Sequence, residues 1–311
     1  MTMATTTGSR RFRSDPGLVA RMGFTMFLIG ALYVLVFALL VAKGIAFGPL
    51  IVIAAIMLFA QYFFSDKMAL FGMGGRIVTP EEAPELHGIV DRLCALADMP
   101  KPRVAIADTD IPNAFATGRN PKNAVVCATT GIMRRLSTEE LEGVLSHELS
   151  HVAHRDVAVM TFASFLGMVA GMITRFALYS GMFGGFDDRD DRDGGAAAVV
   201  LIMLVSMLVY IVSFLLTRTL SRYRELSADR SGALLTGRPS ALASALQKVT
   251  GDMARIPTRD LRAAEAFNAF FFTPAIANGF SISTLFSTHP PLEKRLDQLA
   301  KISVELGQPV A

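Results

Sequence analysis

Three histidines and one glutamate fall within eight positions of the stretch LSHELSHVAHRD, residues 145 to 156. The segment before them starts with Ser137 and Glu140 in capping-box spacing and carries apolar residues at helical spacing, which predicts a helix. His147 and His151 are four residues apart, so both imidazoles project from the same helix face. A single zinc ion at ~2.1 Å from each nitrogen needs this geometry.

His154 shares the face but fails the distance test for the same ion. Its Cα is expected ~10.5 Å along the helix axis from that of His147, too far for both rings to bind one metal. We expect His154 to cap the helix end or to face a membrane surface. The alternative for the whole stretch is a polar helix end without metal, but a chance H-E-x-x-H is rare in a chain with five histidines.

A catalytic zinc keeps three protein ligands and one exchangeable water, so a third ligand must come from elsewhere. Glu225 is the best-placed candidate, because SRYRELSAD, residues 221 to 229, follows an apolar run that returns the chain to the same side as His151. Asp229 lies one turn further and suits a hydrogen bond from the second ring nitrogen of a ligand histidine. A solvated helix face with arginine partners is the alternative for both acidic residues.

Four apolar runs are long enough to cross a bilayer, which takes ~20 helical residues. The composition agrees, since 52% of the residues are hydrophobic and only 18% are charged. Buried core helices are the alternative, but four of them would need a much larger soluble protein to cover them. The first run has a charged segment before it and no small-residue cleavage site after it, so we expect an anchor and not a removed signal peptide. The runs cover residues 22 to 42, 45 to 64, 157 to 174 and 196 to 217.

The distribution of cations predicts the orientation. Arginines and lysines cluster before the first run, after the second and after the fourth, whereas the loop between the third and fourth reads FDDRDDRDGG. By the positive-inside rule the N-terminus and both polar segments face the cytoplasm. There Cys94 and Cys127 are expected as free thiols. The net charge of +3 is too small and dispersed to indicate nucleic-acid binding.

The polar segments together are large enough for one soluble domain with a membrane hairpin inserted into it. Short strands are predicted at residues 103 to 108, 113 to 118 and 123 to 129, after a helix at 86 to 97. His151 is six residues from Val157, so an unbroken helix would hold the metal ~9 Å along the axis from the third apolar run.

Four motifs together resemble the HtpX group of membrane zinc metalloproteases, which is related to the CAAX prenyl endopeptidases. They are HELSH, SRYRELSAD, NAFATG at residues 113 to 118 and FSTHPPLEKR at residues 286 to 295. The likeness covers nearly the whole chain. It implies a multi-pass α-helical membrane protein with a mainly α, zincin-like cytoplasmic metallopeptidase domain that carries a small β-sheet.

The predicted organisation has four parts. An N-terminal segment and a two-span hairpin (residues 1–65) precede the first part of the metallopeptidase domain (66–156), and a second hairpin (157–217) precedes its second part (218–311). The resemblance places the protein in the bacterial inner membrane, where it hydrolyses misfolded or damaged membrane proteins in quality control under stress. Its expected partners are polypeptides and the lipid bilayer.

The resemblance also implies residue roles. His147, His151 and Glu225 bind one Zn²⁺ per chain, and Glu148 is the general base. Zinc lowers the pKa of water and polarises the scissile carbonyl, while Glu148 takes the water proton and returns it to the leaving amine. One departure from the family is His154, where a smaller or amide residue is expected.

Two further residues are candidates for contacts to substrate or transition state. NAFATG would form an edge strand that pairs with an extended substrate, with Asn113 holding the substrate backbone. His289 would donate to the developing oxyanion. The alternatives are an ordinary turn and strand for Asn113 and a surface loop for His289. The segment Phe267–Phe272 is either core or a lid.

Other protein classes fit less well. A transporter would carry ionisable groups in mid-bilayer, and the four runs have none there. An intramembrane protease would bury its H-E-x-x-H within a span, whereas RRLSTEELEG precedes the motif here. A non-catalytic zinc-binding scaffold or chaperone is the remaining alternative, and it has no use for Glu148 next to an open coordination position.

Overall fold

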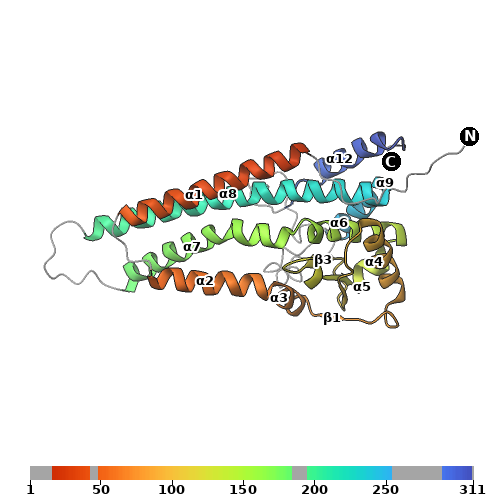
Figure 1. Ribbon diagram of the computed structural model, residues 1–311, viewed down its shortest axis with the longest axis horizontal. Helices are drawn as coiled ribbons and strands as arrows, with labels where there is room; N and C mark the ends of the chain where they lie inside the picture. Colours follow the sequence, from red (N-terminus) through yellow and green to blue (C-terminus); the bar gives the residue numbers. More distant parts are fainter. Residues whose placement is uncertain (1–15, 43–47, 184–194, 254–288, 310–311) are drawn as a thin grey trace, which may run out of the picture.

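The computed structural model describes residues 16–42, 48–183, 195–253 and 289–309. An elongated layer of helices extends from a globular end that contains the sheet (Figure 1). Four long helices form the elongated part: α1 (Pro16–Ala42), α2 (Gly48–Phe63), α7 (Asp156–Phe183) and α8 (Gly195–Thr236). Each coincides largely with one of the four apolar runs. The predicted Phe267–Phe272 segment and the acidic loop before α8 lie outside the described residues.

Membrane-spanning character is evident for one helix of the described part. Met203–Thr236, within α8, is long and apolar enough to cross a bilayer, with a mean hydropathy of 1.9. Thr138–Ala153 and Asp156–Gly171 would make a second span if taken together, but they bend by 62°. The four-span arrangement therefore stays a prediction.

The globular end contains a small mixed sheet with strand order β1-β2-β4-β3. Strand β2 pairs parallel with β4, while β1 with β2 and β3 with β4 are antiparallel. Three strands fall within two residues of their predicted positions, and β3 is an edge strand of the sheet. The prediction of a mainly helical fold with a small β-sheet is confirmed. The strands are β1 (Gly75–Ile77), β2 (Arg103–Ala107), β3 (Ala114–Thr117) and β4 (Val125–Thr129).

Shorter helices surround the sheet and α6 (Thr138–Ala153). The predicted amphipathic helix forms as α4, whose Leu86, Ile89, Val90 and Leu93 are buried in the main core. That core joins α4, α6, α9 and α12 with one face of the sheet. These helices are α3 (Ser65–Gly72), α4 (Pro84–Ala97), α5 (Thr130–Arg135), α9 (Pro239–Met253) and α12 (Leu292–Glu305), with a 3-10 turn at Pro121–Asn123.

The H-E-x-x-H helix α6 begins with the predicted capping box. Ser137 accepts from the Glu140 backbone N–H, and the Glu140 carboxylate accepts from the Ser137 N–H at 2.9 Å. The helix ends at Ala153 with His154 as its C-cap, and Arg155 takes a left-handed φ of 56°. The helix thus does not continue unbroken into the third apolar run, and the ~9 Å estimate, which assumed an unbroken helix, does not apply. Because a left-handed residue cannot continue a right-handed helix, α7 starts afresh in a new direction.

Helix α8 packs closely against α6 at Gly232. A Cβ atom at this position would lie 2.9 Å from the backbone nitrogen of His147 and 2.8 Å from the Ser146 hydroxyl. Only a residue without a side chain lets the two helices approach this far. The distance between the motif helix and the helix that carries Glu225 is thus set by a glycine.

Gly232→Ala should force α8 away from α6. We expect a loss of about 1–3 kcal/mol in the free energy of unfolding, typical of overpacking, and weaker metal binding because Glu225 moves with α8. Thermal unfolding and metal titration in detergent measure both. The matched control is Gly88→Ala, on the exposed face of α4, where nothing lies within 4 Å of the new Cβ. A Gly232→Ala protein as stable as wild type would contradict the close-approach argument.

Candidate metal centre

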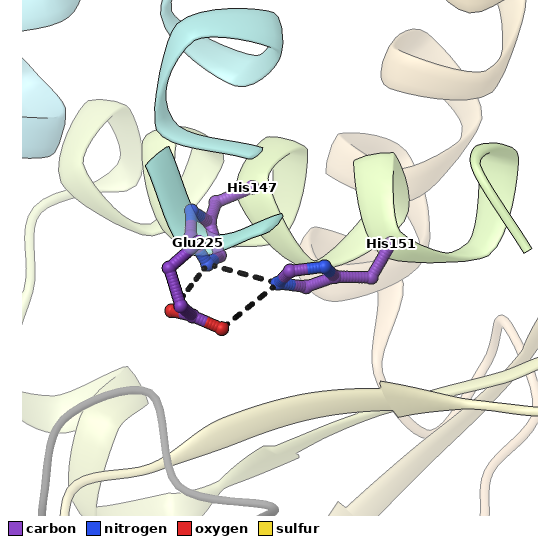
Figure 2. Close-up of side chains that lie close together, drawn as sticks. All are labelled: His147, His151 and Glu225. Atoms are coloured by element: carbon purple, nitrogen blue, oxygen red, sulfur yellow. Dashed lines mark hydrogen bonds and ion pairs between the residues drawn. The ribbon is translucent and has the colours of Figure 1, made fainter. Parts of the chain in front are cut away.

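Three side chains from two helices converge on one point (Figure 2). His147 and His151 project from α6 and Glu225 from α8, and one ligand atom of each lies within 4.8 Å of the others. The two Nε2 atoms are 3.2 Å apart, and the Glu225 oxygens lie 3.6 Å from His147 Nε2 and 3.5 Å from His151 Nε2. Ligand atoms at ~2.1 Å from one tetrahedral ion are about 3.4 Å apart. The spacing therefore fits a single zinc ion.

A buried carboxylate orients the first histidine. His147 Nδ1 lies 2.9 Å from Asp229 Oδ1, so the N–H on Nδ1 directs the Nε2 lone pair towards the metal position. Asp229 is completely buried. Arg295 from α12 donates two hydrogen bonds to it, from Nε at 2.7 Å and from Nη2 at 2.6 Å. The carboxylate is thus neutralised by a bidentate guanidinium.

The second histidine has an equivalent arrangement on the other side. His151 Nδ1 lies 2.5 Å from Asp156 Oδ2, and Arg224 Nη2 donates to the same oxygen at 2.6 Å. Asp156 is the first residue of α7, and the break before it brings its carboxylate back to His151. Each motif histidine is therefore held by an aspartate, and each aspartate by an arginine.

The pKa values of His147 and Glu148 in this cluster are shifted from those of exposed side chains. Burial alone would lower the pKa of His147, but its hydrogen bonds to Asp229 and Glu225 outweigh burial and raise the pKa to about 9. Burial raises the pKa of Glu148, against the opposing effect of His147 and His151. The surroundings of His147 thus favour positive charge, as a site for a cation requires.

Glu148 lies between the motif helix and the edge strand. Its Oε2 accepts a hydrogen bond of 3.1 Å from the backbone N–H of Ala116 in β3. This N–H is therefore directed away from β4, on the open side of the strand. Glu148 is buried and belongs to neither of the two histidine–aspartate pairs. The group of candidate metal ligands contains the two histidines and Glu225, so the role of Glu148 stays a prediction.

The remaining sequence candidates occupy distinct places. Asn113 is fully buried just before β3, where its backbone exchanges two hydrogen bonds of 2.9 Å with Thr129. His289 is buried, with Nδ1 3.0 Å from Glu225 Oε2, so it contacts the candidate ligand and does not lie in a surface loop. His154 is the C-cap of α6, outside the three-residue cluster. Roles for Asn113 and His289 stay predictions.

Sequence reasoning missed three residues of this cluster: Asp156, Arg224 and Arg295. All three lie inside motifs that were recognised, at the ends of LSHELSHVAHRD and FSTHPPLEKR and within SRYRELSAD. Glu225 and Asp229 are buried, which does not fit a solvated helix face. The recognised motifs contain four acidic residues that the fold buries, Glu148, Asp156, Glu225 and Asp229. Buried carboxylates need cationic partners, so the arginines in the same motifs were the available signal.

Comparison with known proteins gives the family. The sequence model of peptidase family M48 matches residues 80 to 303. The chain belongs to peptidase family M48. The predicted resemblance of this M48 peptidase to the HtpX group is confirmed by relatives that are named HtpX proteases.

Three relatives illustrate the likeness. The chain is 62% identical over 298 residues to Protease HtpX homolog 1 of Streptomyces coelicolor, covering 96% of this chain and 97% of the relative. It is 57% identical over 300 residues to Protease HtpX homolog of Moorella thermoacetica, covering 96% and 99%. It is 43% identical over 294 residues to Protease HtpX homolog of Pyrococcus furiosus, covering 94% and 98%.

A solved structure shares the fold. The crystal structure of S. mikatae Ste24p matches with a TM-score of 0.53 and 16% identity, covering 92% of this chain and 67% of the other. The similarity at this identity concerns the fold alone. Family and relatives together make the chain a membrane metalloprotease.

Asp156→Asn should loosen the His151 ring without removing a ligand. We expect metal affinity to fall about 10- to 100-fold, the usual effect of losing a hydrogen-bond partner of a ligand histidine. Equilibrium dialysis measures the affinity, and the visible spectrum of the cobalt-substituted protein reports the ligand geometry. Asp297→Asn, on an exposed part of α12, is the control. Unchanged affinity and spectrum in Asp156→Asn would mean that the aspartate does not orient the ligand.

Proposed function

We propose that this M48 peptidase is a zinc-dependent endopeptidase of the cell inner membrane that hydrolyses misfolded or damaged membrane proteins. One observation carries the proposal above all others. The Nε2 atoms of His147 and His151 are 3.2 Å apart, and each lies 3.5 or 3.6 Å from one of the two Glu225 oxygens. Glu148 follows His147 on the same helix, and its carboxylate is close enough for both rings to lower its pKa. Such a set, with one metal ion per chain, matches the needs of a catalytic zinc that keeps an open position.

The donor set supports zinc among divalent ions. Two imidazoles and one carboxylate suit zinc, and the contacts from Nδ1 to aspartates orient both rings with Nε2 towards the proposed metal position. His147, His151 and Glu225 would hold the ion. When bound, it acts as a Lewis acid towards water and the scissile carbonyl.

Protein groups carry the proton. Glu148 would take a proton from the attacking water and later give it to the leaving amine, so that the peptide bond is hydrolysed without a covalent intermediate. The Ala116 N–H holds one oxygen of Glu148 in place, and burial raises the pKa of Glu148 towards the working range of a general base. A non-catalytic zinc scaffold, the alternative function, would give neither feature a purpose.

The edge strand β3 would align the substrate. Its side away from β4 carries the Ala116 N–H, next to Glu148, and an extended polypeptide adds to such an edge by main-chain hydrogen bonds. We propose that Asn113, at the start of this strand, contacts the substrate backbone. His289, packed on Glu225, is the proposed donor to the oxyanion.

The helices that carry or contact the candidate ligands support the proposed membrane placement. Glu225 lies on α8, which also contains the fourth apolar run. Asp156, which contacts His151, is the first residue of α7. We propose that residues 1–65 and 157–217 form the two membrane hairpins and that 66–156 and 218–311 form the metallopeptidase domain. The arginine-rich flanks support our proposal that this domain lies on the cytoplasmic face.

Glu148→Gln should abolish turnover and keep the metal. The amide cannot accept the water proton, so we expect a loss of at least 10²-fold in kcat, while metal content stays at wild-type level. Casein-type digestion with and without chelator, beside metal analysis, measures both. Glu139→Gln in the first turn of the same helix is exposed and serves as the control.

Loss of metal is the expected result for the ligand variants His147→Ala, His151→Ala and Glu225→Ala. Near-normal peptidase activity in Glu148→Gln would make the base assignment wrong. Stoichiometric zinc in Glu225→Ala would move the third ligand elsewhere, and His289 would be tested first.

A membrane anchor on the substrate should accelerate cleavage. Because α7 and α8 hold the site at one end of the apolar helices, it meets chains that emerge from the bilayer more readily than soluble ones (Figure 1). The same unstructured sequence, offered with and without an anchor in one bilayer preparation, should be cut faster when anchored. Equal rates would remove the physical case for membrane-protein substrates and leave the peptidase assignment intact.

A further inference from the structure

A cavity of about 380 Å³ lies where α2 ends and α3 begins. Aromatic residues line one part of it, and charged residues of α3, β2 and the turn after β3 line another. No candidate residue of the metal centre is among them. The aromatic residues are Phe59, Phe63 and Phe64, and the charged ones are Asp66, Lys67, Arg103 and Arg119.

The cavity has an excess of positive charge. Three cations against one carboxylate leave two positive charges unbalanced, since Arg103 pairs with Asp66 at 2.6 Å. Lys67 and Arg119 have no carboxylate partner in the part of the chain that the structure describes. Each instead lies over an aromatic ring, Lys67 at 5.8 Å from Phe64 and Arg119 at 5.1 Å from Phe63. A cation–π contact leaves the N–H groups of a guanidinium available to oxygen ligands.

Local structure holds Arg119 at this position. Gly118, with φ of 141°, lets the turn pass so close that a Cβ would lie 2.4 Å from the Asn123 carbonyl oxygen. Tyr62 of α2 donates a hydrogen bond of 3.2 Å to the Arg119 carbonyl. The turn after the edge strand is therefore tied to the end of α2. The cation does not depend on a freely moving loop.

Exposed aromatic rings line the cavity, and a further one lies outside it on α3. Phe59, Phe63 and Phe64 are 56%, 38% and 45% exposed, and Phe71 at the end of α3 is 91% exposed. Basic side chains and an amphipathic ring such as that of Tyr62, at the end of an apolar helix, are typical of the boundary between hydrocarbon and headgroups. If α2 crosses the bilayer as proposed, the cavity opens at the level of the lipid phosphates.

We propose that this cavity binds the phosphate headgroup of an anionic membrane lipid. Lys67 and Arg119 contact the phosphate oxygens, and the phenylalanine rings contact the glycerol and the first part of the acyl chains. The exposed rings favour a lipid over a free phosphate, because a small anion would leave these rings in contact with water. The proposal rests on the membrane placement in the proposed function and adds a ligand to it.

The composition of the chain offers a direct test, because it contains no tryptophan. Phe64→Trp provides a single tryptophan in the cavity wall, and Phe71→Trp provides one outside it. Each full-length protein is reconstituted in phosphatidylcholine vesicles that contain a small fraction of brominated phosphatidylglycerol or brominated phosphatidylcholine. Bromine quenches tryptophan only at short range. Trp fluorescence at position 64 should be quenched at a lower mole fraction of brominated phosphatidylglycerol than of brominated phosphatidylcholine. The difference between the two lipids should be smaller at position 71.

Charge removal identifies the ligands. Lys67→Gln and Arg119→Gln should each reduce the preference for phosphatidylglycerol about fivefold, equivalent to about 1 kcal/mol per basic residue at the membrane surface. Lys294→Gln with Lys301→Gln removes the same charge from exposed positions of α12 and should leave the preference unchanged.

Three outcomes would overturn the proposal. Equal quenching by both brominated lipids would exclude anionic preference, and an equal loss in the α12 control would reduce it to net charge. Displacement of brominated phosphatidylglycerol by millimolar inorganic phosphate would assign the cavity to a small anion. Absence of quenching by either lipid at both positions would instead contradict the membrane placement of α2 and α3, whereas the Glu148→Gln assay reports on the peptidase assignment independently.

Discussion

Two imidazole nitrogens are held 3.2 Å apart inside the protein, and most of the site exists to maintain this approach. Lone pairs that converge on one point favour a cation between them, provided that the rings cannot turn away. Asp229 and Asp156 prevent the rotation by binding the opposite ring nitrogens. Buried carboxylates in turn need counter-charges, which explains why Arg295 and Arg224 are buried with them.

These successive requirements explain why residues from four helices form the site. Helix α6 supplies the histidines, α7 and α8 supply the two aspartates, and α8 and α12 supply the arginines. Removal of one arginine would leave a buried, unpaired carboxylate, which is far more costly than the loss of a surface ion pair. The C-terminal helix α12 is therefore part of the metal centre, although it contributes no candidate ligand.

Much of the site could be predicted from short-range spacing. The i, i+4 histidines, the capping box of Ser137 and the position of Glu225 after an apolar run each follow from helix geometry. Asp156 could not be predicted in the same way, because its contact with His151 depends on the left-handed Arg155, and arginine has no tendency towards that conformation. Arg295 looks like any charged residue of an amphipathic helix until the fold buries it. In general, contacts within a helix are predictable from sequence, while those across a break or between distant helices are not.

The continuity of α8 has a mechanical consequence. The helix runs for 42 residues without a break, from its apolar part through Glu225 to the contact at Gly232. The histidines, by contrast, are separated from α7 by a bend of 62°. Rotation or tilt of α8, as occurs when an apolar helix adapts to a thicker or thinner bilayer, is thus transmitted directly to the carboxylate, whereas the bend absorbs much of the equivalent motion of α7. A change in the tilt of α8 would therefore alter the separation between Glu225 and the two histidines.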